Sequence, residues 1–341
     1  MIFTLATYYY VNVVSAYNLR HEPEKVIFGL VTVGVGFQNF CKIYTYLTYC
    51  QQIRSMNRYQ EVLLREECNL HTKELLMNNV FAIDLLRKLV FSSYPWTAIV
   101  LLITPLLLTL IGPENILPYG FFMPYLDWNT TLGYAINYVW QIWLTVMVLT
   151  FHMGPDCFYL ILITNAFTQI NLLKNMLERL DESVKDNANQ ETASKLLKRI
   201  IVRHQEHISY LSKLEETFRM NWFVTLSSSS LGLVTTLYAA VILKWYQGFA
   251  YILSITVQIG FVCILGTMLD MKNEQLQQTV YKISWYRLSN SHQKSIGFFL
   301  SVTQETKAQT LIFAPLNMPT FLQLYKTIYS IFTMLIAVKK E

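Results

Sequence analysis

Two polar side chains inside an apolar stretch are the residues of this chain best suited to chemistry. His152 and Asp156 are four residues apart, so on a helix they share one face and could bind a metal ion or relay a proton. They lie about 20 residues, or about 30 Å of helix, from the start of their apolar segment, which places them at the far edge of a membrane core. Capping at that edge and contacts between subunits are the favoured interpretation, and no metal site is predicted.

The run of four serines from Ser227 to Ser230 could contain a nucleophile. A nucleophilic serine needs a neighbouring base, and no His or acidic residue is placed with this run. Small residues also let helices pack closely, which is the favoured interpretation. We therefore predict no catalytic residue and no cofactor, and we do not expect an enzyme.

The composition indicates which elements carry these side chains. Of 341 residues, 53% are hydrophobic and only 14% are charged, and the mean hydropathy is +0.31, as in a protein surrounded by lipid. About 20 apolar residues in a helix cross a bilayer core, and inside lipid every backbone polar group must be paired. We predict an all-α membrane protein in which residues 1–338 form one seven-helix domain, with spans at 1–19, 26–50, 94–112, 132–165, 220–244, 249–271 and 319–338.

The distribution of charge predicts the direction of these helices. Twenty of the 27 Lys and Arg residues fall in the three connections after the second, fourth and sixth segments. Positively charged loops stay in the cytosol, so we predict a cytosolic N-terminus and an extracellular C-terminus. The one glycosylation sequon, Asn129-Thr130-Thr131, falls on the predicted outer side. The five cysteines fall in helices or on the cytosolic side, so no external disulfide is expected.

Two cytosolic connections, residues 166–219 and 272–318, have helical patterns of their own. Apolar residues recur at helical spacing from Leu172 to Leu180 and again from Ile201 to Phe218, with a break at residues 186–189 between them. The later connection mixes aromatic and aliphatic residues with charges. We predict that membrane helices extend into the cytosol and form a helical anchor. A surface helix lying on lipid is the alternative.

Several other classes of seven-helix protein are disfavoured. A G-protein-coupled receptor needs an external N-terminus, and the chain has no Asp-Arg-Tyr after the third segment and no Asn-Pro-x-x-Tyr in the last. A polytopic transporter stays open as an alternative, although no inverted repeat or Gly-rich break is evident. The chain opens in an apolar segment without a basic leader, so no cleaved signal is expected, and a soluble stretch usual ahead of this layout is expected to be missing.

The last third of the chain carries a specific series of residues. They are Asn273-Glu274, Tyr281, Trp285-Tyr286, Gln304, Ala314-Pro315-Leu316, Thr320-Phe321, Lys326, Tyr329-Ser330, Phe332 and Leu335. Together they resemble the C-terminal signature of insect odorant receptors, and His204-Gln205 with Leu214 to Phe218 is similar to the second cytosolic loop of that family. The chain departs from the family at Lys272, where Gly is frequent. It looks unlike the coreceptor, whose second cytosolic loop is much longer. The end of the chain does not match the related gustatory receptors, and a gustatory-type chemoreceptor of the same superfamily stays open as an alternative.

This resemblance implies a ligand-specific subunit of a tetrameric, ligand-gated, nonselective cation channel. The implied partners are a small volatile odorant, coreceptor subunits in a heterotetramer and the lipid bilayer, with no nucleic acid. The implied location is the plasma membrane, as a multi-pass protein, in the dendrites of olfactory sensory neurons.

The family lines its pore with the last helix. On segment 319–338, six residues spaced three or four apart share one face that is polar at its inner part and apolar at its outer end; they are Thr320, Gln323, Thr327, Ser330, Met334 and Val338. The last two match the family's outer gate, where an apolar constriction can close a pore by dewetting. The alternative is that the hydroxyls bond to their own helix and the face packs on a neighbour.

The family binds odorants in the outer half of the bilayer, among the second, third, fourth and sixth segments. An apolar cavity with a few hydroxyl groups suits a small volatile molecule, because burial supplies most of the affinity. Helix packing is the alternative for each candidate. The candidates are Phe28, Val31, Thr32, Val35, Leu101, Thr104, Leu108, Tyr134, Asn137, Tyr138, Gln141, Tyr251, Ile252 and Ile255.

Overall fold

The computed structural model describes most of the chain. It covers residues 2–18, 23–67, 70–112, 115–119, 121–124, 126–185, 190–242, 244–304, 310 and 314–340, and within them it leaves out the side chains of 2–6, 16, 23–31, 67, 70–82, 190 and 338–340. The predicted break at 186–189 lies outside these residues.

Helices make up almost all of the described structure. In chain order they are α1 (Ile2–Asn18), α2 (Pro23–Glu67), α3 (Leu70–Ile111), α4 (Thr131–Lys185), α5 (Gln190–Ile242), α6 (Gly248–Lys282), a short 3₁₀ turn (Trp285–Arg287), α7 (Asn290–Gln304) and α8 (Met318–Lys340). The 55 residues of α4 correspond to about 80 Å of helix, far more than the about 30 Å of a bilayer core. Helices four and five therefore continue well past their predicted membrane segments, as their apolar stripes predict.

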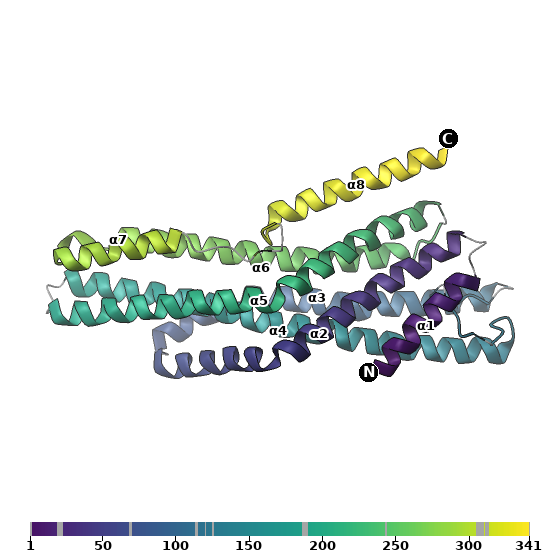
Figure 1. Cartoon of the computed structure of the whole chain (residues 1–341), viewed down its shortest axis with the longest axis horizontal. Helices are drawn as coiled ribbons and strands as arrows, with labels where there is room; N and C mark the ends of the chain where they lie inside the picture. Colours follow the sequence, from purple (N-terminus) through teal and green to yellow (C-terminus); the bar gives the residue numbers. More distant parts are fainter. Residues whose placement is uncertain are drawn as a thin grey trace.

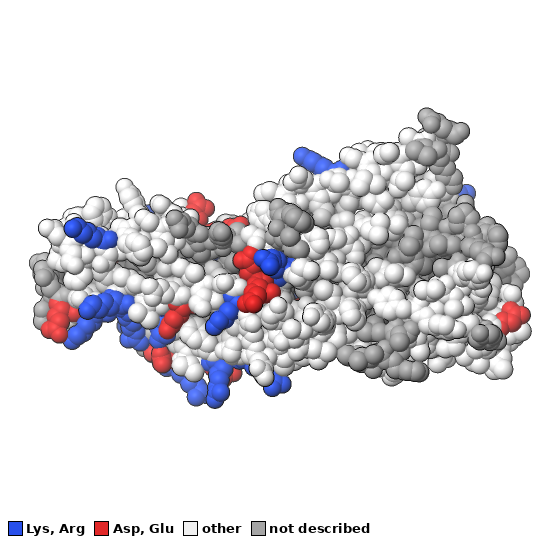
Figure 2. Space-filling model, viewed as in Figure 1, with Lys and Arg blue, Asp and Glu red and all other residues white. Residues whose placement is uncertain are grey.

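The long helices form an elongated bundle with two different halves. In Figure 1, α4, α5 and α6 run through both halves, α7 lies at one end, and α1 lies in the other half. Figure 2 shows that Lys, Arg, Asp and Glu gather on the half that contains α7, whereas the visible face of the other half is nearly free of them. One half thus has a surface suited to lipid and the other a surface suited to water.

The second helix bends between these halves. Tyr49 has non-helical backbone angles, φ −102° and ψ 15°, within α2. This kink lies one residue before the predicted end of the membrane segment at residue 50. The helix therefore changes direction where its surroundings are predicted to change from lipid to water.

Within the described residues, length and composition alone qualify four helices to cross a membrane. They are Ile83–Ile111, Thr131–Lys185, Glu191–Ile242 and the helix that starts at Gly248. The remaining predicted spans, 1–19, 26–50 and 319–338, each include residues or side chains outside the description.

The hydrophobic core follows the middle of α4, where this helix is surrounded by its neighbours. Tyr159, Leu162, Ile163 and Ala166 are fully buried there. The Tyr159 ring lies edge-on to the Trp222 ring of α5, with their centroids 4.8 Å apart. Large aromatic contacts of this kind hold α4 and α5 in register across the boundary between the two halves.

Close approach of the chain to α6 requires a glycine at one position. A Cβ atom at Gly266 would lie 1.7 Å from the backbone carbonyl oxygen of Leu316, in the segment that leads into α8. We expect Gly266→Ala to lower the free energy of unfolding by about 1–3 kcal/mol, because backbone must shift to admit the methyl group. The melting temperature of the purified protein in detergent measures this effect.

The same helix offers a matched control. A Cβ at Gly260 would meet only the Phe321 ring at 3.8 Å, an ordinary contact. Gly260→Ala should leave the melting temperature unchanged or raise it slightly, since alanine is the better helix former. Equal melting temperatures for the two variants would contradict the steric argument.

Candidate functional site

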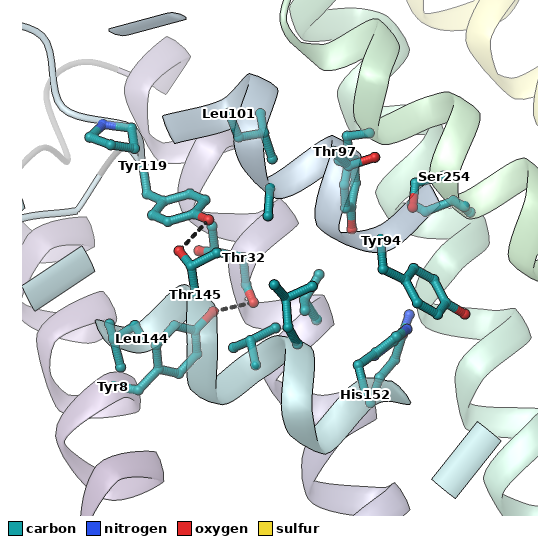
Figure 3. A pocket seen from close by; sticks show the side chains of 18 of the residues that line it. Tyr8, Thr32, Tyr94, Thr97, Leu101, Tyr119, Leu144, Thr145, His152 and Ser254 are labelled. Atoms are coloured by element: carbon teal, nitrogen blue, oxygen red, sulfur yellow. Dashed lines mark hydrogen bonds between the residues drawn. The ribbon is translucent and has the colours of Figure 1, made fainter. Parts of the chain in front are cut away.

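A cavity of about 150 Å³ lies among α1, α2, α3, α4 and α6, in the half of the molecule with few charges. Apolar cavities of this size accept a molecule such as benzene. Its walls are mainly aromatic and aliphatic, and they include Tyr8, Ala98, Leu101, Tyr119, Phe121, Leu144, Val148 and Tyr251. Figure 3 shows Tyr8 and Tyr119 on one side of the cavity, with Tyr94, His152 and Ser254 on the other.

Most polar groups that α1, α3, α4 and the α3–α4 connection place in the cavity walls are already hydrogen-bonded to the protein. The Tyr8 hydroxyl donates to the backbone carbonyl of Thr32, and the hydroxyls of Tyr119 and Thr145 are 2.9 Å apart. The Thr97 hydroxyl lies 2.9 Å from the carbonyl oxygen of Ser93 and 3.2 Å from that of Ala250. These walls therefore present carbon to the cavity and suit an apolar ligand.

The connection between α3 and α4 closes the cavity on one side. Gln141 of α4 donates to the Phe121 carbonyl at 2.7 Å and accepts from the Tyr119 backbone N–H at 3.2 Å. One turn earlier, Asn137 accepts from the backbone N–H of Met123 at 2.7 Å. The two amide side chains thus replace the hydrogen bonds that a buried, irregular backbone otherwise lacks. Phe121 is held by them as part of the cavity wall.

An ion pair lies below the cavity. The Lys42 ammonium nitrogen of α2 is 2.7 Å and 2.9 Å from the two carboxylate oxygens of Asp156 in α4, and the two side chains are 0% and 1% exposed. It also donates to the backbone carbonyl of His152 at 3.2 Å. Charges so far from water are stable only when they are paired and hydrogen-bonded, as here.

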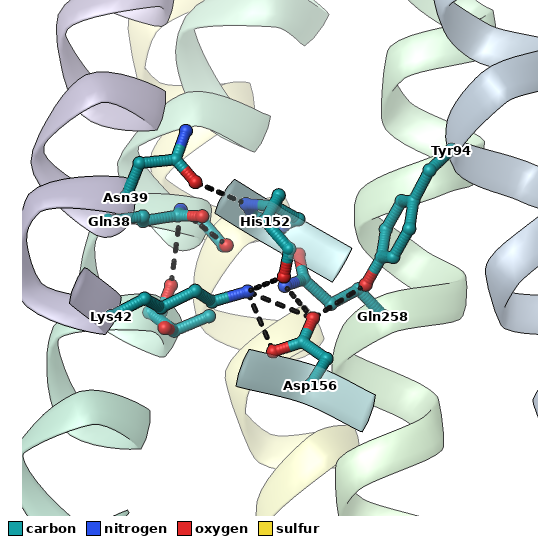
Figure 4. Close-up of polar contacts among 9 residues, drawn as sticks. Gln38, Asn39, Lys42, Tyr94, His152, Asp156 and Gln258 are labelled. Carbon is teal, nitrogen blue, oxygen red and sulfur yellow. Dashed lines mark hydrogen bonds and ion pairs between the residues drawn. The ribbon is translucent and has the colours of Figure 1, made fainter. Parts of the chain in front are cut away.

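Other helices join this cluster, which we call the polar floor: Gln38, Asn39, Lys42, Tyr94, His152, Asp156 and Gln258 (Figure 4). The Tyr94 hydroxyl of α3 donates to Asp156 at 3.0 Å, and the Gln258 amide nitrogen of α6 is 2.8 Å from Nε2 of His152. Four members of the polar floor, Gln38, Tyr94, His152 and Gln258, also line the cavity. The cluster therefore connects four helices directly beneath any bound molecule.

The sequence interpretation of His152 and Asp156 is wrong on one point. Both are buried within the chain and paired across helices, so they do not cap a membrane edge or contact another subunit. The sequence contained an indication of this pairing. Lys42 is the one charged residue of segment 26–50 and Asp156 that of segment 132–165, and opposite charges inside a membrane protein usually pair with each other. Among the described residues, no group of three or more His, Cys, Asp or Glu could hold a metal ion.

Five of the predicted ligand residues line the cavity. These are Thr32, Val35, Leu101, Tyr251 and Ile255. The side chains of Phe28 and Val31 lie outside the described residues. The structure thus brings together the predicted parts of α2, α3 and α6, and their role in ligand binding stays a prediction.

The other predicted ligand residues do not reach the cavity. Asn137 and Gln141 hold the α3–α4 connection, and Tyr138 donates to the Leu102 carbonyl. Tyr134 bonds to Thr109 at 3.2 Å, and Thr104 to its own helix. Leu108 is largely exposed on the outside of the bundle, and Ile252 packs against the core. The α3–α4 connection thus packs on the outermost turns of α4. The cavity therefore lies closer to the middle of the bundle than the predicted site.

Sequence reasoning missed the contributions of α1 and of the α3–α4 connection. Tyr8 and Phe121 are almost fully buried and their rings meet edge-on at 5.8 Å. The aromatic residues around Phe121 were a usable signal, because a solvated loop rarely carries so many.

The predicted pore residues lie on the side of α8 that faces away from the bundle. α8 packs through Ile328, which is buried, and through the Tyr325 hydroxyl, 2.6 Å from that of Thr256. Gln323, Thr327, Ser330 and Met334 are exposed. Thr320 lies half-buried in the first turn of α8, where its hydroxyl donates to Asn317 at 3.1 Å, and the side chain of Val338 lies outside the description. The Thr327 and Ser330 hydroxyls bond to their own helix, yet no neighbour within the described chain covers this face. Figure 1 shows α8 leaving the bundle at an angle.

These features define a multi-pass helical membrane protein with a buried cavity of small-molecule size. The chain belongs to the family described as 7tm Odorant receptor, which matches residues 22–329. It is 21% identical to putative odorant receptor 83c of Drosophila melanogaster, over 98% of this chain and 88% of that one. It is 24% identical to odorant receptor 10 of Aedes albopictus, over 64% and 60% of the two chains.

Solved structures show the same fold. The insect olfactory receptor OR5 of Machilis hrabei superposes with a TM-score of 0.80 over 99% of this chain and 88% of that one, at 11% identity. Its complex with eugenol gives 0.77 over the same shares, also at 11% identity. Family and fold confirm the predicted odorant receptor resemblance and the seven-helix membrane fold, and they confirm a receptor rather than an enzyme.

Proposed function

We propose that this chain is the odorant-binding subunit of a ligand-gated, nonselective cation channel, assembled with coreceptor subunits into a heterotetramer. The observation that carries the proposal is the cavity between the helices, whose wall polar groups are mostly bonded to the protein and whose remaining surface is apolar. Such a site binds small apolar molecules largely through burial. A receptor of the same fold was solved in complex with eugenol, a small aromatic molecule.

In this proposal α8 lines the pore. Its exposed face carries Gln323, Thr327 and Ser330 toward one end and Met334, 69% exposed, toward the other. A polar stripe on a membrane helix faces water or protein rather than lipid. Four such faces around an axis would enclose a wet inner vestibule, and Met334 with Val338 would form an apolar outer gate.

The proposed orientation puts the charged half of the molecule, with α7, in the cytosol as an anchor, and the C-terminus outside. The subunit would then work in the plasma membrane, in dendrites of olfactory sensory neurons. Asn129 is exposed in the α3–α4 connection, so it should carry an N-linked sugar when the protein is made in insect or mammalian cells. Removal of N-glycans should increase gel mobility of the wild type and leave Asn129→Gln unchanged. An unglycosylated Asn129, together with an Asn129→Cys thiol that reacts only with reagents supplied from the cytosol, would reverse the orientation.

Current measurements in cells test the function. Cells that express this chain together with a coreceptor should give a current when a panel of volatile molecules is applied, and its reversal potential should shift when either Na⁺ or K⁺ is replaced. Cells that express either chain alone should give none to the same ligands. Absence of ligand-evoked current, with both chains shown at the cell surface and binding shown separately, would overturn the channel proposal.

A further inference from the structure

Three polar residues of α6 lie along one wall of the cavity. Tyr251, Ser254 and Gln258 are spaced three and four residues apart, so they share a face of the helix, and all three line the cavity. The side chains of Ser254 and Gln258 are among the most buried polar groups of the site, at 7% and 3% exposure. Figure 3 shows Ser254 beside Tyr94 and His152, on the side of the cavity that adjoins the polar floor.

The side-chain amide of Gln258 uses its nitrogen in hydrogen bonds within the protein and leaves its oxygen available. Its amide nitrogen is 2.8 Å from Nε2 of His152 and 3.5 Å from a carboxylate oxygen of Asp156. The carboxylate can only accept, which assigns the nitrogen to this side of the amide. The amide oxygen therefore points elsewhere, and within the described part of the chain no donor reaches it.

Ser254 is in a similar position. A serine in a helix commonly donates to the carbonyl four residues earlier, but the Ala250 carbonyl already accepts the Thr97 hydroxyl at 3.2 Å. No described residue donates to or accepts from the Ser254 hydroxyl. Both residues line the cavity, and polar groups shielded from bulk water are rarely left without a hydrogen-bond partner, so the partner of these two groups is expected inside the cavity.

We propose that Ser254 and Gln258 form a polar subsite that binds the hydroxyl group of a small alcohol or phenol, with its carbon skeleton against the apolar walls. A ligand hydroxyl can accept from Ser254 and donate to the Gln258 oxygen, and so satisfies both groups at once. An ether or ketone can only accept and leaves Gln258 unsatisfied. A hydrocarbon leaves both unsatisfied. The subsite rests on the proposed use of the cavity as the odorant site.

Matched sets of probes test this order of affinity. One set is 2-phenylethanol, its methyl ether and ethylbenzene, and a second set is 1-hexanol, its methyl ether and hexane. Binding is measured on the purified chain in detergent, as the rise in melting temperature with ligand concentration. Within a set, the alcohol should bind about tenfold more tightly than the ether, which corresponds to one hydrogen bond.

Variants separate the hydroxyl contact from general packing. Ser254→Ala should weaken binding of the alcohol about tenfold and leave that of the hydrocarbon unchanged. Ser230→Ala is the matched control, because its hydroxyl bonds to its own helix at Leu226 and lies outside the cavity; it should change neither. The comparison of alcohol, ether and hydrocarbon on the wild type needs no variant and stands if Ser254→Ala folds poorly.

The outcomes distinguish this inference from the channel proposal. Equal affinity for alcohol and hydrocarbon, or an equal loss for both in Ser254→Ala, would overturn the polar subsite even if both evoke current. Selective binding of alcohols without current in cells that contain the coreceptor would uphold the subsite and overturn the channel. Failure of every probe to bind would overturn the cavity as a ligand site and the subsite with it.

Discussion

Replacing Lys42 by methionine is expected to destabilise the protein by about 3–5 kcal/mol, because it leaves the Asp156 carboxylate buried without a counter-charge. The two side chains are almost completely shielded from solvent, so water cannot take the place of the lost ammonium. The effect should appear as a large drop in melting temperature and in the yield of monodisperse protein. Ligand binding should fall with it, since the polar floor lies directly beneath the cavity.

The double variant Lys42→Met with Asp156→Asn is the control. It removes both charges and keeps an acceptor for the Tyr94 hydroxyl, which now donates to Asp156 at 3.0 Å. Most of the lost stability should return, since replacing a buried ion pair by neutral groups is often close to neutral. A double variant no more stable than Lys42→Met alone would show that the unpaired Asp156 carboxylate is not the source of the effect.

Acidification is expected to destabilise the charged half of the molecule through two buried histidines of α5. Burial lowers the pKa of His204 to about 4. Burial, together with the nearby His204, lowers the pKa of His207 to about 3. Nδ1 of His207 is 2.9 Å from the Gln169 amide oxygen, and no described residue pairs with Nε2 of either ring. The folded structure therefore stabilises the neutral form of both imidazole rings over the charged form.

The lowered pKa values determine how the stability of the folded protein changes with pH. In the unfolded chain a histidine takes up its proton near pH 6.5, whereas the folded chain resists it until pH 4 or 3. Stability is thus complete above pH 6.5 and is lost progressively as the pH falls, by several kcal/mol at pH 4. Melting temperature measured between pH 7.5 and 4 should show this decline.

Substitutions identify the residue responsible. His207→Gln cannot be protonated and should make the decline in melting temperature between pH 6.5 and 4 clearly shallower. His292→Gln on α7 is the matched control for the loss of a histidine in the charged half, because Ser289 and Ser194 contact both of its ring nitrogens. An identical profile for wild type and His207→Gln would refute the assignment to this ring.

Much of the fold follows from simple properties of the sequence. Hydropathy predicts the apolar segments within α3 to α6, because an uncharged run of about 20 residues has few other stable surroundings. Helical periodicity from Leu172 to Leu180 predicts the continuation of α4 past the bilayer. The kink at Tyr49 was not predicted, because neither Pro nor Gly marks it and it depends on packing.

The site was harder to predict, because it depends on contacts between distant segments. Tyr251 and Ile255, two of the predicted ligand residues, are four residues apart on one face of α6 and line the cavity, and their role in binding stays a prediction. Asn137 and Gln141 bond to the α3–α4 connection and do not line the cavity. Nothing local in the sequence indicates that this connection folds inward and takes up their amides. The pairing of Lys42 with Asp156 could be predicted from the sequence, because each is the one charged residue of its apolar segment and buried charges are stable only when paired.

We propose that small volatile molecules act on the channel from the cavity beneath the α3–α4 connection. Ala98 is a small residue in the cavity wall, so Ala98→Phe should fill the space that a ligand occupies. Val241→Phe, at an exposed apolar position of α5 outside the cavity, is the control. In cells that also express the coreceptor, volatile-evoked current should be present in the wild type and Val241→Phe and lost in Ala98→Phe at equal surface expression. Undiminished current and unchanged potency in Ala98→Phe would contradict the account.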